Sequence, residues 1–124
     1  MVNISRDTFI EFINESIDEL PKNHIQSLKN VAIIVEDRPS QEQLKRLNVA
    51  KYQTLYGLYE GIPLSQRQGI QKTLPDKITL FKEPLQEGSR NLIDLKENIK
   101  HTLWHEIAHY YGLNHEQIKG LETD

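Results

Sequence analysis

The strongest constraint on the fold of this chain is the spacing of its histidines in the last quarter of the sequence. His105 and His109 are separated by one turn of a potential helix, and His115 follows six residues after the second histidine. Side chains four residues apart project from the same face of an α-helix. The spacing therefore predicts a helix through His105 and His109 whose two imidazoles can reach one metal ion.

The segment after this helix must double back if His115 is to reach the same ion. Gly112 stands where the helix is expected to end, and glycine adopts the left-handed conformation without the penalty of a Cβ atom. Three neutral imidazoles leave the fourth tetrahedral position of a zinc ion open to water, as in catalytic sites. We predict one Zn²⁺ per chain, bound by His105, His109 and His115.

Glu106 follows the first histidine directly and lies about 100° further around the helix. It is placed to flank the metal without ligating it and to take a proton from zinc-bound water. Glu106 is therefore the predicted catalytic residue, with the role of general base.

Three further residues of this helix are open to more than one interpretation. His101 lies about 12 Å along the helix from His109, too far to share an ion, so a solvated or cleft-lining role is favoured over a role as ligand or partner of a ligand. Tyr110 and Tyr111 border the motif, and a phenol can hydrogen-bond an oxyanion. Aromatic side chains at helical spacing more often belong to a core or cleft wall, and both interpretations stay open.

The remaining hydrophobic pattern predicts a small sheet. The continuously apolar run Val31–Val35 is typical of a central strand buried on both faces. The alternating segment Lys77–Phe81 is followed by Pro84, which favours an edge strand. The other expected elements are helices over 5–20, 91–111 and 116–121, a short helical segment through about 28, one or two helical turns over 43–47, a strand over 53–60, and loops over 61–76 and 87–90.

Composition narrows the class of protein. The 124 residues, 37% hydrophobic and 27% charged, predict one globular domain over residues 1–124. The absence of cysteine excludes disulfides and thiolate metal sites. A net charge of −3 gives no basic footprint, so a nucleic-acid partner is not expected. The sequence shows neither a signal peptide nor an apolar membrane span, and we expect a cytoplasmic protein without membrane association.

Four blocks of the sequence resemble the small bacterial zincin-like metallopeptidases, also called minimal metalloproteases. The resemblance runs from about residue 7 to residue 121, and the extended motif over 105–115 is similar to that of the metzincins. It implies an α+β fold, with a small mixed β-sheet flanked by helices, an active-site helix near the C-terminus and zinc at an open cleft. The four blocks span residues 30–37, 57–64, 74–80 and 105–109.

Two features depart from the related patterns. Many members of the resembled family carry an acidic residue at the third-ligand position, where this chain has His115. Histidine there is closer to the metzincins. Met1 is the only methionine, however, so the Met-turn that follows the motif in metzincins is not expected.

The sequence favours a zinc-dependent metallopeptidase whose substrate is a peptide or protein. We also expect an extended peptide to add to the edge strand predicted at Lys77–Phe81. One alternative is a metal-dependent endoribonuclease of the rRNA-maturation type, which uses similarly spaced histidines but generally lacks the glutamate. Another is a non-catalytic zinc-binding module. The sequence does not indicate cleavage specificity, endo- or exopeptidase action, or oligomeric state.

Overall fold

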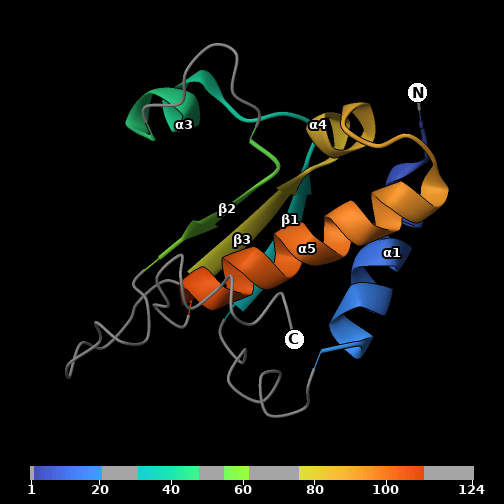
Figure 1. The fold of residues 1–124 in the computed structure, drawn as a ribbon. Coiled ribbons are helices and arrows are strands. Elements are labelled where there is room, and N and C mark those ends of the chain that lie inside the picture. Colours follow the sequence, from blue (N-terminus) through green and yellow to red (C-terminus); the bar gives the residue numbers. More distant parts are fainter. Residues whose placement is uncertain (1, 21–30, 48–54, 62–75, 111–124) are drawn as a thin grey trace.

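The computed structural model describes residues 2–20, 31–47, 55–61 and 76–110. Figure 1 shows helix α5 crossing in front of a small sheet, with helix α1 beside it. This arrangement confirms the predicted α+β fold with a mixed sheet and a long helix late in the chain. The elements are α1 (Arg6–Asp18), β1 (Val31–Glu36), α3 (Gln41–Arg46), β2 (Gly57–Glu60), β3 (Asp76–Phe81), α4 (Lys82–Glu87) and α5 (Leu92–Tyr110).

The two long helices begin at the side-chain caps that the sequence provides. The Ser5 hydroxyl accepts a hydrogen bond from the Thr8 amide at 3.1 Å, and the Asn91 side chain accepts one from the Asp94 amide at 2.8 Å. Such caps satisfy amides that the first helical turn leaves without partners. The predicted helices over 5–20 and 91–111 are confirmed to within two residues of the ends of α1 and α5.

The strand order corrects the prediction for two strands. The order is β1–β3–β2, with β1 parallel and β2 antiparallel to β3. The strand at Lys77–Phe81, predicted at an edge, is therefore the central one, and Ile78, Thr79 and Leu80 are fully buried. The strand at Val31–Val35, predicted to be central, lies at one side of the described sheet and is mostly half-buried. The apolar content of a single strand did not predict its position in the sheet, because that position depends on which strands pair with it.

A helix that the sequence did not predict begins directly after β3. The strand ends at Phe81 as predicted, and Pro84, three residues further on, occupies the first turn of α4. The amides of a first helical turn have no acceptor within the helix, so proline is tolerated there. The loop expected over 87–90 follows, between α4 and α5.

The core lies between the sheet and the helices. Ile78 and Leu80 of β3 belong to a cluster with the buried faces of α1 and α5. The cluster comprises Phe9, Phe12, Ile13, Leu20, Val35, Ile78, Leu80, Leu85, Leu95, Ile99, Leu103 and Ile107. An ion pair between Lys100 and Glu19 at 2.8 Å adds to the contact between these two helices.

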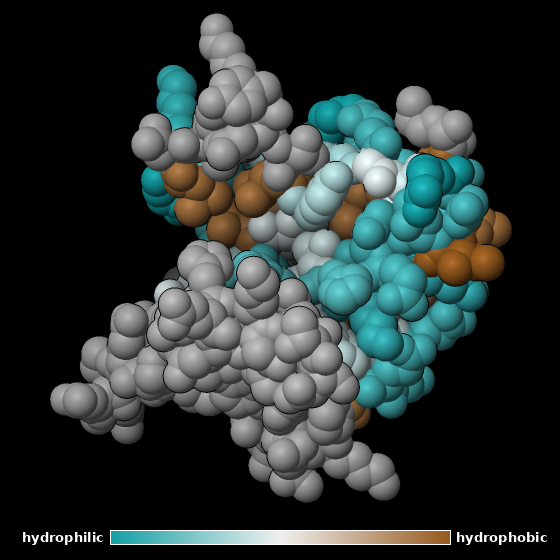
Figure 2. Space-filling model, viewed as in Figure 1, coloured by the Kyte–Doolittle hydropathy of each residue, from teal (hydrophilic) through white to brown (hydrophobic). Residues whose placement is uncertain are grey.

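The surface of the described residues is mostly hydrophilic on the face shown in Figure 2. Leu92 and Ile93, at the start of α5, are exposed hydrophobic residues. None of the described helices is both long enough and apolar enough to span a membrane. The helix predicted over 116–121, the helical segment through about 28 and most of the loop predicted over 61–76 lie outside the described residues.

Candidate metal centre

The last turns of α5 carry the candidate metal centre. The buried stripe of this helix runs from Leu95 through Leu103 to Ile107 and faces the core. His105 and His109 lie beside the stripe and are half-buried, whereas Glu106 lies within it and is buried. One helix therefore presents two imidazoles toward the border of the core and one carboxylate into it.

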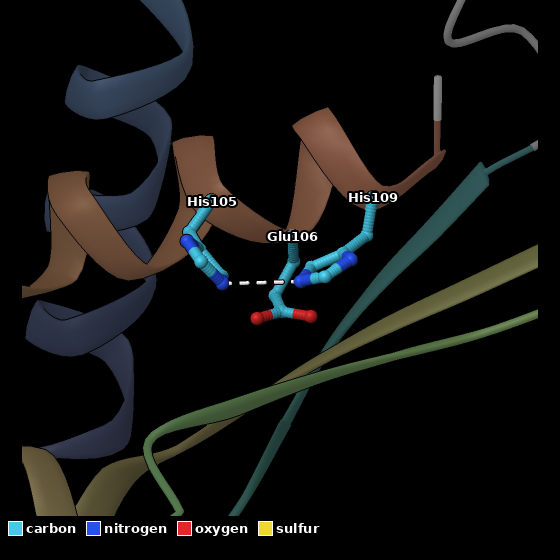
Figure 3. Close-up of side chains that lie close together, drawn as sticks. All are labelled: His105, Glu106 and His109. Atoms are coloured by element: carbon cyan, nitrogen blue, oxygen red, sulfur yellow. Dashed lines mark hydrogen bonds between the residues drawn. The ribbon is translucent and has the colours of Figure 1, made fainter. Parts of the chain in front are cut away.

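The two histidines point toward the same place. Their Nε2 atoms are 3.0 Å apart, and the rings meet edge to face with centroids 4.7 Å apart. Figure 3 shows both side chains extending from α5 in the direction of the strands, with the Glu106 carboxylate near them. Potential ligand atoms of the three residues all lie within 4.8 Å of one another.

This donor set fits a zinc ion. Two nitrogens bound to tetrahedral zinc at about 2.0–2.1 Å stand about 3.3 Å from each other, close to the observed 3.0 Å between the Nε2 atoms. A neutral imidazole can offer one nitrogen lone pair to a metal. The structure thus brings His105 and His109 together as predicted, and His115, the third predicted ligand, lies outside the described residues.

Glu106 lies against strand β2. Its side-chain Oε1 accepts a hydrogen bond from the main-chain amide of Tyr59 at 3.0 Å. Burial raises the pKa of the Glu106 carboxyl to about 7, and the bond from Tyr59 acts in the opposite direction. A carboxyl with a pKa near neutral pH suits proton transfer. A cation held by the neighbouring imidazoles would favour its ionised form.

The pairing of the strands explains why the Tyr59 amide is available to Glu106. The Phe81 amide donates to the Tyr56 carbonyl at 2.9 Å, which makes that position of the β2–β3 ladder a hydrogen-bonded pair. Hydrogen-bonded and non-hydrogen-bonded pairs alternate along an antiparallel ladder. The amides of Gly57 and Tyr59 are therefore directed away from β3. Glu106 binds the side of β2 opposite to that partner strand.

Gly57 allows the close approach of β2 to α5. A Cβ atom at this position would lie 2.6 Å from Cγ2 of Thr102 and 3.3 Å from Cγ of Glu106. The first separation is shorter than any ordinary contact, so a larger residue would press the strand and helix apart. The sequence marked this segment, because residues 57–61 form part of one resembled block. Nothing in the pattern indicated that the strand would contact Glu106.

Two other residues of the helix are placed by the structure. His101 is exposed, in keeping with the favoured solvated role. Tyr110 is buried, with its ring edge-on to Tyr59 at a centroid distance of 6.0 Å, which supports the core interpretation. Tyr111 and Gly112 lie outside the described residues.

The fold and the paired histidines are those of a zincin-type metal protein, and comparison with known proteins agrees. Residues 28–124 match the family described as Zincin-like metallopeptidase. The match covers most of the chain, so this protein belongs to that family. The family and the His–Glu–His grouping indicate a zinc-dependent hydrolase.

A solved structure with a similar fold comes from a conserved hypothetical protein of Thermus thermophilus. It has a TM-score of 0.60 and 20% sequence identity, and the alignment covers 94% of this chain and 98% of that one. At this identity the likeness concerns the fold alone. No curated protein matches this sequence.

Proposed function

We propose that this protein is a zinc metallopeptidase that cleaves peptide bonds, with His105, His109 and His115 as metal ligands and Glu106 as general base. The observation that carries the proposal is the position of the Glu106 carboxylate. It is buried beside two converging imidazoles and has no side-chain cation among its described hydrogen-bond and ion-pair partners. Burial of a carboxylate disfavours its ionised form, so this placement lowers the stability of the fold. A role in catalysis explains why a carboxylate is nevertheless placed there.

Bound at the imidazoles, zinc supplies Lewis-acid polarisation of a carbonyl and lowers the pKa of a water molecule. Glu106 accepts the proton of the attacking water and then delivers it to the amine that leaves. Burial raises the pKa of this carboxyl and so favours uptake of the proton, whereas a neighbouring cation would favour its release. The Tyr59 amide holds one carboxylate oxygen, which leaves the second for the proton.

The position of strand β2 favours a peptide as the substrate. The strand at Lys77–Phe81, predicted to bind an extended peptide, is paired on both sides and cannot do so. In the described sheet, β2 has β3 on one side only, and its other side carries the contact with Glu106. The Tyr59 amide on that side is used by Glu106. The main-chain groups of Gly57 face the same side, where an added strand would form hydrogen bonds next to the base.

The two alternatives are less well supported. The negative net charge offers no electrostatic attraction for RNA. A non-catalytic module needs its zinc site closed by a fourth ligand, and it gives no reason to bury Glu106 beside the histidines.

The test is hydrolysis by the zinc-loaded protein, assayed on a mixed peptide library and on RNA in parallel. The wild type is expected to cleave peptides, and Glu106→Gln should reduce the rate roughly 10² to 10⁴-fold by removing the base. Glu97→Gln is the matched control, since it makes the same change at an exposed position of α5. Cleavage of RNA without cleavage of peptides would overturn the proposal, and so would equal rates for wild type and Glu106→Gln.

A further inference from the structure

Strand β2 contacts Glu106 through its main chain, and this contact is suited to fixing the orientation of the Glu106 side chain. The donor is a backbone amide, whose direction is fixed by the strand rather than by a side-chain rotamer. The carboxylate oxygen lies 3.0 Å from it, and Glu106 is only 8% exposed. When Glu106 is ionised, this bond is charge-assisted and therefore stronger than a neutral one. It therefore restricts the rotation of the Glu106 side chain.

The support depends on the absence of a side chain at Gly57. This residue is two positions before Tyr59 in an extended strand, so the two share one face of β2. Its Cα approaches α5 so closely that a methyl group would meet both Thr102 and Glu106. The backbone conformation of Gly57 does not require glycine, since Gly61 is the one described glycine with a positive φ. Its role is close approach.

We infer that Gly57 and the Tyr59 main-chain amide position the Glu106 carboxylate for proton transfer, so that β2 acts as a positioning element of the catalytic site. The inference rests on the proposed function for its kinetic consequence but not for the contact itself. Gly57 is a positioning residue, because it acts through Glu106.

Amide hydrogen exchange tests the contact without any activity assay. In the metal-free and zinc-loaded wild type the Tyr59 amide should be protected. Glu106→Ala, which removes the acceptor, should accelerate its exchange roughly 10-fold or more. The Leu58 amide is the internal control, because Leu58 faces β3 in the hydrogen-bonded register and does not use Glu106. Equal exchange of the Tyr59 amide in wild type and Glu106→Ala would overturn the inference.

A double-mutant cycle tests the positioning. Gly57→Ala should lower kcat at least 10-fold with little change in KM or zinc content, since a misplaced base affects the transition state alone. In a Glu106→Gln background the same substitution should cost almost nothing further. Equal losses in both backgrounds would show a merely structural effect and overturn the inference while leaving the proposed function intact.

Two variants guard against loss of folding as the explanation. Gly57→Ala with Thr102→Ser removes the closest predicted clash, at Cγ2 of Thr102, and should recover stability while Glu106 remains displaced. Gly88→Ala is the matched control, because its Cβ would meet the hydroxyl of Tyr56 and not Glu106. It should lower stability without coupling to Glu106→Gln. If the wild type cleaves no peptide but Glu106→Ala frees the Tyr59 amide, the peptidase proposal fails and the contact stands.

Discussion

Two carboxylates at strand β2 lie in contrasting environments: Glu60 belongs to the strand, and Glu106 lies against it. Glu60, at the end of the strand, forms ion pairs with Arg46 at 2.7 Å and with Lys77 at 3.6 Å. It also accepts a hydrogen bond from the side-chain amide of Gln43 at 3.3 Å. Partial burial pushes the pKa of Glu60 upward, but these hydrogen bonds and charges outweigh it and hold the pKa below its ordinary value. Glu106 is more deeply buried, receives one described backbone amide, and has a pKa raised to about 7.

The comparison separates a carboxylate that is used for structure from one that we propose to be used for chemistry. The protein supplies Glu60 with side-chain cations that connect β2 to α3 and β3. For Glu106, the expected cation is a metal held by the neighbouring imidazoles of His105 and His109. The two carboxylates therefore differ in the source of the compensating positive charge.

Loss of the metal is the largest expected effect. Single replacement of His105, His109 or His115 by Ala should reduce zinc from about one ion per chain to a small fraction, because two ligands bind zinc far more weakly than three. His101→Ala is the control, since this residue is exposed and outside the grouping. Metal analysis of the purified variants checks this. Zinc retained by His115→Ala but lost by His101→Ala would refute the ligand assignment.

Chelation should lower the melting temperature. Ligand that binds only the native state stabilises it by roughly 2.7 kcal/mol when free zinc is about 100 times Kd. A thermal scan with and without chelator measures the shift, and His109→Ala should show none. A metal-free wild type that melts as high as the zinc-loaded protein would contradict a tight site.

The next effect is smaller and concerns Glu106 without its metal. In chelator at pH 8, Glu106→Gln should be as stable as wild type or more stable by up to about 2 kcal/mol, because a buried ionised carboxylate is replaced by a neutral amide. Urea unfolding of both proteins provides the comparison. A large loss of stability would mean that Glu106 is needed for the fold rather than for the reaction.

The smallest effect belongs to Glu60. Its lowered pKa means that its contribution to stability is present above the ordinary carboxyl pKa and is lost as the pH falls through the lowered value. Glu60→Gln should therefore cost up to about 1 kcal/mol at pH 7, as expected for a partly exposed ion pair, and less at pH 3. Urea unfolding at both pH values checks the sign. A cost that grows toward low pH would refute this role.

Local sequence signals predicted most of the elements and the paired histidines. Ser5 and Asn91 marked the starts of α1 and α5, and the four-residue spacing of His105 and His109 predicted their convergence. These features depend on contacts within one helix turn, so neighbouring residues suffice to define them. Helix α3 was only partly predicted, although its capping box between Ser40 and Gln43 was readable.

Features that depend on distant segments could not be predicted. Strand order follows from packing across the whole sheet, so the positions of Val31–Val35 and Lys77–Phe81 were exchanged. The contact between the Tyr59 amide and Glu106 joins residues 47 positions apart, and a backbone donor leaves no chemical trace in the sequence. Gly57 was visible as a residue but not as the point where β2 meets α5.

We propose that Glu106 flanks a three-histidine zinc ion as a base and is not one of its ligands. A crystal structure of the zinc-loaded protein, with the ion located by its anomalous signal, tests this most directly. We expect zinc at about 2.0–2.1 Å from one nitrogen each of His105, His109 and His115. We also expect a Glu106 oxygen to stay hydrogen-bonded to the Tyr59 amide. Zinc bound directly by the Glu106 carboxylate in place of His115 would contradict this assignment.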